Sequence, residues 1–92
     1  MANFIITYDL NGPFPSHKQM DDHLRSLAAN RGRILETVWW VSYAGTAAAL
    51  RDQVRTILGT EDFLLVCECK SAAWTKLLVE SQAFKSAFEA AA

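Results

Sequence analysis

The run RILETVWWVSY at residues 33–43 constrains the fold of this chain more than any other stretch. It is rich in β-branched and aromatic residues, which favour strands. It is also too long to form one strand in the small sheet that 92 residues can build. We therefore predict two antiparallel strands divided at Glu36 and Thr37, which places a β-hairpin near the middle of the chain.

Two further strands are expected, one before this hairpin and one after it. Residues 3–9 alternate with period two, so that Phe4, Ile6 and Tyr8 should face a core. The run DFLLVCEC at residues 62–69 is almost continuously apolar. Such a run is typical of a strand that is central in its sheet or covered on both faces.

Helices are expected between these strands and after the last one. The run SHKQ at residues 16–19 forms a capping box, and Gly32 is a stop signal for the helix that follows. Thr46 should cap a second helix that Gly59 closes, and Ser71 should cap a last helical region. The apolar positions at helical spacing are Met20, Leu24, Leu27, Ala28, Leu50, Val54, Ile57, Leu58, Trp74, Leu77, Leu78, Phe84 and Phe88.

The resulting order is β-α-β-β-α-β followed by an extra C-terminal helix. This is the α+β, ferredoxin-like plan, in which two helices cover one face of an antiparallel sheet. Residues 1–92 should form a single domain, with a core at about 3–69 and a helical extension at about 71–90. The second face of the sheet is open unless the tail or another subunit covers it.

The composition limits the classes of function. Nine basic and ten acidic residues give a net charge of -1, which argues against a strong electrostatic grip on nucleic acid. No run approaches the ~20 apolar residues of a membrane helix, and no secretory signal is recognisable. We therefore expect a cytoplasmic protein with no membrane partner. The cytoplasm is a reducing compartment, so Cys67 and Cys69 should remain free thiols.

Asp9 stands at the end of an apolar strand, and its residue type allows two interpretations. As a ligand of Mg²⁺, it would supply one of the oxygen atoms that this ion prefers. Two Asp9 side chains that meet across a two-fold axis would make a better site than one. Alternatively, Asp9 accepts hydrogen bonds from backbone N–H groups of the Asn-Gly loop that follows, a common use of aspartate at turns.

Trp39, Trp40 and Tyr43 crowd the second strand of the hairpin, and they are candidate dimer or open-face aromatics. Neighbours on a strand point to opposite faces, so only one of the two tryptophans can enter the helix-covered core. The other lies on the open face, against a second subunit, against the terminal helix, or against stacked bases. Arg31 and Arg33 are candidate nucleic-acid contacts, for which a mixed solvated surface is the alternative.

The histidines and cysteines give weaker signals. His17 and His23 are six residues apart, so they cannot form the i,i+4 pair of a zinc site. Cys67 and Cys69 share one face of a strand and are not a Cys-x-x-Cys motif, so we expect buried free thiols. Glu68 faces the opposite side and would be a second carboxylate if that side were open.

The strand ending in ITYDL, the capped helices and the hairpin LETVWWV resemble the small CRISPR-associated endoribonuclease-like proteins. The sharp motif is a Tyr-Asp-aliphatic triplet, here Tyr8, Asp9 and Leu10. A closer resemblance over residues 3–76 is to short bacterial proteins labelled SinR-like, through the segments YDLN, LLV and AAWT.

This resemblance implies a homodimer of ferredoxin-like subunits. It also implies that Asp9 pairs across the dimer axis and binds Mg²⁺ for phosphodiester hydrolysis, as in a metal-dependent nuclease. Those proteins place several arginines soon after the aspartate, whereas this chain has LNGPFPSHKQMDD. The alternative is therefore a non-catalytic dimeric module that binds a partner through the open sheet face.

Overall fold

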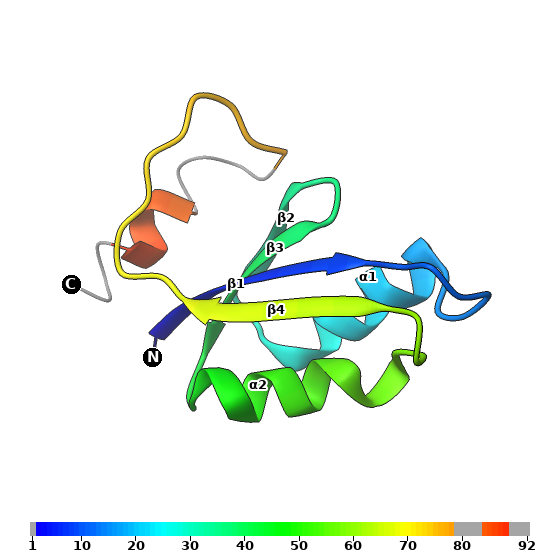
Figure 1. The fold of residues 1–92 in the computed structure, drawn as a ribbon. Helices are drawn as coiled ribbons and strands as arrows, with labels where there is room; N and C mark the ends of the chain where they lie inside the picture. The colour runs from blue at the N-terminus through cyan, green and yellow to red at the C-terminus, as the bar shows by residue number, and fades with distance from the viewer. Residues whose placement is uncertain (1, 79–83, 89–92) are drawn as a thin grey trace.

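The protein is described here by a computed structural model, which covers residues 2–78 and 84–88. Four antiparallel strands form one open sheet in the order β2-β3-β1-β4, and helices α1 and α2 cover one of its faces (Figure 1). The chain is therefore a small α+β protein. Its elements are β1 (Ala2–Asp9), α1 (His17–Leu27), β2 (Arg31–Leu35), β3 (Val38–Tyr43), α2 (Ala47–Val54), the 3-10 turn η1 (Arg55–Ile57) and β4 (Phe63–Glu68).

The main core lies between the helices and the sheet. Phe4, Ile6 and Tyr8 enter it from β1, as the period-two pattern predicts. The helix stripes supply the opposite wall, and β3 supplies one residue in every two. The buried members of this core are Phe4, Ile6, Tyr8, Met20, Leu24, Trp39, Val41, Leu50 and Val54.

Of the three expected helix starts, the first two are confirmed by their caps. Ser16 accepts a hydrogen bond from the backbone N–H of Gln19, and the Gln19 side chain accepts one from the backbone N–H of Ser16. Thr46 likewise accepts from the backbone N–H of Ala49. The end of α1 differs from the expectation, because its last helical residue is Leu27 and Gly32 lies inside β2.

The hairpin at the middle of the chain is confirmed, with β2 and β3 joined through Glu36 and Thr37. The pairing shifts register between Arg33 and Leu35, which marks an irregularity in β2. β3 is an inner strand, because it pairs with β2 on one side and with β1 on the other.

The expectation that residues 62–69 form a central or doubly covered strand is wrong. Within residues 2–78 and 84–88, β4 pairs only with β1, which makes it an edge strand. Only one of its faces packs against the core, through Leu64 and Val66. The side chains of Phe63 and Leu65 on the other face are 68% and 58% exposed. A continuous apolar run is compatible with either burial state, because periodicity does not distinguish them.

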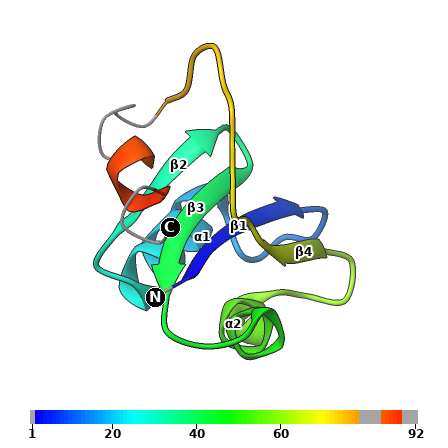
Figure 2. The ribbon, with the colours of Figure 1, turned by 90° about the vertical axis from the view of Figure 1, so that its left-hand side faces the viewer.

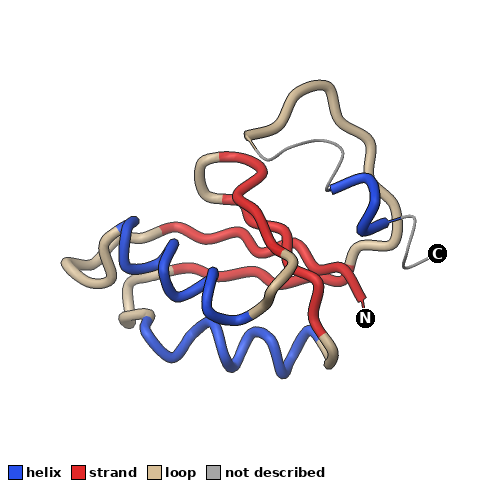
Figure 3. Tube along the Cα trace, turned by 180° about the vertical axis from the view of Figure 1, so that it is seen from behind, coloured by secondary structure: helices blue, strands red, loops and turns tan. Residues whose placement is uncertain are grey.

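The C-terminal region also differs from the expected helix over about 71–90. Residues 71–78 are not helical, and residues 84–88 form a short helix on the sheet face opposite α1 and α2 (Figures 2 and 3). The remaining positions of the expected helix lie outside the described residues. We call this second face of the sheet the outer face.

The terminal segment covers one half of the outer face. Phe84, 2% exposed, packs against Trp40 with ring centroids 5.5 Å apart, and Ile34 completes this second cluster. The side chain of Asn3 holds the segment in place. Its Oδ1 accepts from Trp40 Nε1 at 2.9 Å, and its Nδ2 donates to the carbonyl of Ala87 at 3.1 Å.

Among residues 2–78 and 84–88, no helix is both long enough and apolar enough to cross a membrane.

Candidate functional site

The half of the outer face that the terminal segment leaves uncovered is the candidate functional site. It lies where the end of β1 runs beside the beginning of β4 (Figure 1). Cross-strand pairing sets Thr7 against Leu65 and Asp9 against Phe63. We call Thr7, Asp9, Phe63, Leu65 and Cys67 the open strip. Because the two strands are adjacent, the strip joins one carboxylate to a continuous apolar surface.

Asp9 is exposed at the end of β1 and borders a hollow of about 320 Å³. Its neighbours around this hollow include Thr7, Thr37, Phe63 and Leu65. No hydrogen bond or ion pair from any residue in the described ranges reaches its carboxylate, which leaves both oxygen atoms available to a ligand. The sequence-based candidate is thus accessible, and its surroundings are apolar or neutral.

The loop N–H groups that were expected to occupy Asp9 bind Asp62 instead. Asp62 accepts from the backbone N–H of Asn11 at 2.8 Å, of Gly12 at 3.2 Å and of Gly59 at 2.8 Å. The hydrogen bonds from Gly59 and Asn11 hold the pKa of the Asp62 carboxyl below its usual range. Asp62 therefore fastens the β1–α1 loop to the turn before β4, and the turn interpretation of Asp9 does not apply.

Tyr8, the first member of the Tyr-Asp-aliphatic motif, points away from Asp9. Alternation along β1 sends its side chain into the helix-covered core, where it is 4% exposed. Burial raises the pKa of its hydroxyl above the usual value of a tyrosine, and the neighbouring Trp39 indole opposes this shift. The hydroxyl is therefore neutral at pH 7 and is not a base for chemistry at Asp9.

Arg31 and Arg33 do not lie beside Asp9. Strand pairing sets them opposite Val41 and Trp39, whose side chains are on the helix-covered face. Arg33 lies 3.9 Å from a carboxylate oxygen of Asp21 on α1, and Arg31 donates to the carbonyl of Ala29 at 3.0 Å. The two arginines and Asp9 therefore belong to opposite faces of the sheet. Their role as nucleic-acid contacts stays a prediction.

The three candidate aromatics divide between the two faces. Trp39 is in the core under the helices, and Tyr43 packs against the same core with its ring 6.2 Å from that of Phe4. Trp40 alone lies on the outer face, where Phe84 covers it. The prediction that only one of the two tryptophans enters the helix-covered core is confirmed, and neither Trp39 nor Tyr43 lies on the outer face. Of the alternatives considered for the outer-face tryptophan, the structure shows packing against the terminal helical segment, because Phe84 covers Trp40.

The remaining candidates form no further centre. His23 bonds the carbonyl of Gln53 through Nε2 at 2.9 Å, which links α1 to α2. Cys67 is exposed and Cys69 partly exposed, so the expectation of buried thiols is wrong for Cys67. In the part of the chain that the structure describes, no three histidine, cysteine or acidic side chains gather where they could hold a metal ion.

One Asp9 per subunit is a poor fit to a metal ion on its own. Mg²⁺ is usually held by one or two carboxylates together with water or substrate phosphate. Asp9 supplies one carboxylate, and the residues around it add hydroxyl and apolar groups only. A second carboxylate would have to come from another subunit.

Two residues that matter to this arrangement were not found by sequence reasoning. Asn3 is 2% exposed and bridges β3 to the terminal segment, and Asp62 fastens two loops. The sequence marks Asn3 only weakly, because the one sign of a special role is that a polar residue stands in an otherwise apolar strand. Asp62 stands directly before a strand, where an aspartate is unremarkable.

Comparison of the chain with models of known protein families gave no match, and comparison with curated protein sequences gave none either. Fold and site together therefore define a class only: a small α+β protein whose open antiparallel sheet is covered by helices on one face and half covered on the other.

Proposed function

We propose that the chain is a homodimeric module whose two subunits associate through the open strip. The observation that carries this proposal is the exposure of Phe63 and Leu65, at 68% and 58%, side by side with Thr7 and Asp9. Contiguous exposed apolar surface marks interaction sites. β4 is also an edge strand, and such strands present unpaired backbone groups to a partner.

A second copy of the chain is the partner that suits this surface. A two-fold interface brings the same patch of each subunit together, so an apolar strip is complementary to itself. A small domain also leaves much of its apolar surface unburied, and a second copy would cover it. Near such an axis, two Asp9 carboxylates would repel each other unless a cation or water separated them.

The fold that we propose for each subunit is ferredoxin-like. The order of elements and the strand order β2-β3-β1-β4 support this plan. The added 3-10 turn after α2 and the terminal segment on the outer face are features of this chain beyond that plan. We further propose a cytoplasmic location, a reducing compartment that would keep the thiols of Cys67 and Cys69 free.

The dimer is tested by the mass of the protein in solution. Sedimentation of the full chain across a hundredfold range of concentration should show a dimer that dissociates on dilution. Leu65→Lys should give a monomer with an unchanged far-UV spectrum, because it places a charge on the strip. Leu35→Lys is the matched control, since Leu35 is a 50% exposed leucine on β2. A parent protein that stays monomeric at high concentration would refute the proposal.

A second candidate function is Mg²⁺-dependent phosphodiester hydrolysis at paired Asp9 residues, and the resemblance to CRISPR-associated endoribonuclease-like proteins suggests it. The specific observation in its favour is that Asp9 is exposed and that no described residue occupies its carboxylate. An ion held there would activate water and stabilise charge on a phosphate. Against it stands the placement of Arg31 and Arg33 on the other face of the sheet.

This second function is tested with labelled single-stranded RNA and double-stranded DNA. Each is incubated with the protein in Mg²⁺ or in chelator. Cleavage by the parent protein that needs Mg²⁺ and disappears in Asp9→Asn, but persists in Asp52→Asn, would establish it. Asp52 is a suitable control because it is an exposed aspartate of α2 that pairs with Arg51 and Arg55. Equal cleavage by Asp9→Asn protein would indicate a contaminant.

A further inference from the structure

The two edges of the sheet are protected to different degrees. On β2, Arg31 and Arg33 carry charges, and the register shifts between Arg33 and Leu35. The backbone N–H of Leu78 also donates to the carbonyl of Ile34 at 3.0 Å, so the terminal segment occupies part of this edge. Charged side chains, irregular pairing and covering segments keep an edge strand from pairing with another chain. The edge at β2 is therefore a protected one.

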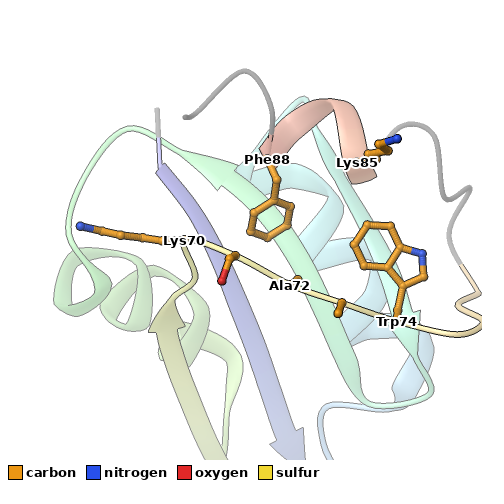
Figure 4. A pocket seen from close by; sticks show the side chains of 7 residues that line it. Lys70, Ala72, Trp74, Lys85 and Phe88 are labelled. Atoms are coloured by element: carbon orange, nitrogen blue, oxygen red, sulfur yellow. The ribbon is translucent and has the colours of Figure 1, made fainter.

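The edge at β4 has none of these protections among the described residues. Its residues 63–67, FLLVC, include no charged side chain and no proline. Figure 4 shows that the chain leaves β4 through Lys70, Ala72 and Trp74, across the outer face and away from the β4 edge. An apolar edge strand without charge or cover is the kind that pairs with a further strand. The β4 edge is therefore the candidate surface for strand pairing.

The hydrogen-bond pattern shows which backbone groups of β4 reach this edge. The backbone N–H of Cys69, one residue beyond the end of β4, donates to the Asn3 carbonyl at 2.8 Å. Hydrogen-bonded and non-hydrogen-bonded pairs alternate along an antiparallel ladder. The odd-numbered residues of β4 therefore bond to β1, whereas the N–H and C=O groups of Leu64 and Val66 point to the free edge. No other described strand or loop binds these groups.

We propose that β4 pairs antiparallel with β4 of a second copy of this chain, so that two four-stranded sheets join into one continuous sheet. This inference rests on the proposed dimer and specifies its geometry. A two-fold axis perpendicular to the sheet sets each β4 against the other in opposite directions. The helices of both copies then lie on one face of the joined sheet, and the two open strips meet on the other face.

Charge selects the register of this pairing. The two registers that pair most of β4 place the axis at Leu65 or at Val66, because residues opposite each other must lie on the same face. An axis at Leu65 sets Asp62 against the partner's Glu68, and like charges directly opposite each other are destabilising. An axis at Val66 instead sets Leu64 against the partner's Glu68. We therefore expect the register centred on Val66.

A hollow beside Leu64 can receive the partner's Glu68. It has a volume of about 330 Å³, and its lining consists of Arg51, Arg55, Leu58, Gly59, Asp62 and Leu64. The Asp62 carboxylate is occupied by backbone N–H groups. The two arginines share Asp52, at 3.0 and 3.2 Å, and a guanidinium has further N–H donors for a second carboxylate.

Glu68 is exposed, and no described residue binds its carboxylate. Residues opposite each other on paired strands are close enough for their side chains to interact. In the register centred on Val66, the Glu68 carboxylate therefore comes within reach of the arginines beside Leu64. The β4 edge thus presents both halves of an ion pair between subunits, and a second copy of this chain is the partner that fits it.

This geometry separates the two Asp9 carboxylates. Asp9 pairs with Phe63, so it lies one strand in from the joined edge and three residues from the axis at Val66. With strands about 4.8 Å apart and a rise of about 3.4 Å per residue, the two Asp9 Cα atoms lie roughly 25 Å apart. A single ion does not span this distance. The edge-paired dimer is therefore incompatible with Mg²⁺ shared by paired Asp9 residues.

Amide hydrogen exchange of the full chain tests the pairing. Sedimentation identifies the concentrations at which the protein is a dimer or a monomer. In the dimer, the amides of Leu64 and Val66 should exchange roughly tenfold more slowly than in the monomer, whereas those of Leu65 and Cys67 should be protected in both. A dimer whose Leu64 and Val66 amides exchange as fast as in the monomer would overturn edge pairing alone. A protein that is monomeric at every concentration would overturn the proposed dimer as well.

Val66→Pro removes an edge N–H that the subunit itself does not use. Proline is tolerated in an edge strand where the missing N–H faces solvent, so the far-UV spectrum should be unchanged. The dimer dissociation constant should rise roughly tenfold, because an edge proline opposes strand pairing. Val66→Ala is the matched control, since it shortens the same side chain and keeps the N–H. Equal dissociation of the two variants would assign the effect to side-chain packing and contradict the pairing.

The ion pair between subunits is tested by exchanging its charges. Glu68→Arg and Arg55→Glu should each raise the dissociation constant roughly fivefold, since a two-fold dimer contains the contact twice. The double variant should recover most of the parent affinity. Glu36→Arg, at an exposed carboxylate in the hairpin turn, is the control and should leave the dimer unchanged. A double variant that dissociates as readily as the single variants would overturn the register centred on Val66.

Discussion

The bridge made by Asn3 gives the sharpest test of how the terminal segment is held. Asn3 is 2% exposed, and its side chain joins Trp40 Nε1 on β3 to the carbonyl of Ala87. Asn3→Ala removes both hydrogen bonds at once. Trp40 is 3% exposed, so its indole N–H cannot turn to water while Phe84 covers the ring.

The expected loss of stability follows from these two bonds. A buried donor left without an acceptor costs about 1–3 kcal/mol, and an ordinary hydrogen bond contributes about 0.5–1.5 kcal/mol. Ala87 is partly exposed, so water can hydrate its carbonyl. Loss of the hydrogen bond to this carbonyl should therefore cost only about 0.5–1.5 kcal/mol. We therefore expect Asn3→Ala to lower the free energy of unfolding by about 2–4 kcal/mol, a large share of the 5–15 kcal/mol of a typical domain.

Urea unfolding followed by tryptophan fluorescence measures this loss, with thermal unfolding as a second assay. A destabilisation of about 2 kcal/mol should lower the melting temperature of a domain of this size by roughly 8–16 °C. Asn30→Ala is the control, because Asn30 is exposed and contributes only its backbone carbonyl, which accepts from the N–H of Ser42. A change below about 0.5 kcal/mol in Asn3→Ala, with an unchanged near-UV spectrum, would refute the reasoning, since that value is the usual limit for surface substitutions.

Two further predictions concern the caps and loops. Ser16→Ala should lower the free energy of unfolding by about 0.5–2 kcal/mol, because it removes the hydrogen-bond acceptor of the α1 capping box. Ser26→Ala, near the end of α1, removes no cap and should not cause this loss. Urea unfolding of the two variants measures the difference. The pKa of the Asp62 carboxyl is lower in the folded protein than in the unfolded chain. Its contribution to stability is therefore complete at pH above the unfolded-state pKa. That contribution is lost as the pH falls through the folded-state pKa. Stability measured between pH 7 and pH 2 should therefore fall less steeply in Asp62→Asn than in the parent protein, and parallel pH profiles would contradict this.

Local sequence signals determined most of the elements and their boundaries. The capping residues Ser16 and Thr46 predicted the helix starts, because a cap depends only on side chains within the same turn. The period-two pattern of β1 predicted which residues enter the core. The length of the run at 33–43 predicted the hairpin, since one strand could not hold it. The prediction that Gly32 ends the first helix was wrong, because this helix already ends at Leu27 and Gly32 lies in β2.

The candidate site shows where local signals end. The sequence correctly singled out Asp9 as a residue at a strand end, but it offered two uses for the carboxylate. The loop amides are taken by Asp62, a residue distant along the chain, and no local pattern records that competition. Similarly, the two tryptophans were assigned to opposite faces by strand geometry alone, whereas the cover on Trp40 depends on where the terminal segment folds back.

The sequence by itself determined the α+β class, the central hairpin and the helix-covered core, because these follow from the spacing of apolar residues within each segment. Only the tertiary structure decided that β4 is an edge strand, that Arg31 and Arg33 lie across the sheet from Asp9, and that the tail covers half of the outer face. The physical reason is that strand order and face assignment are set by contacts between segments far apart along the chain, and apolar periodicity reports only which residues are buried, not what buries them.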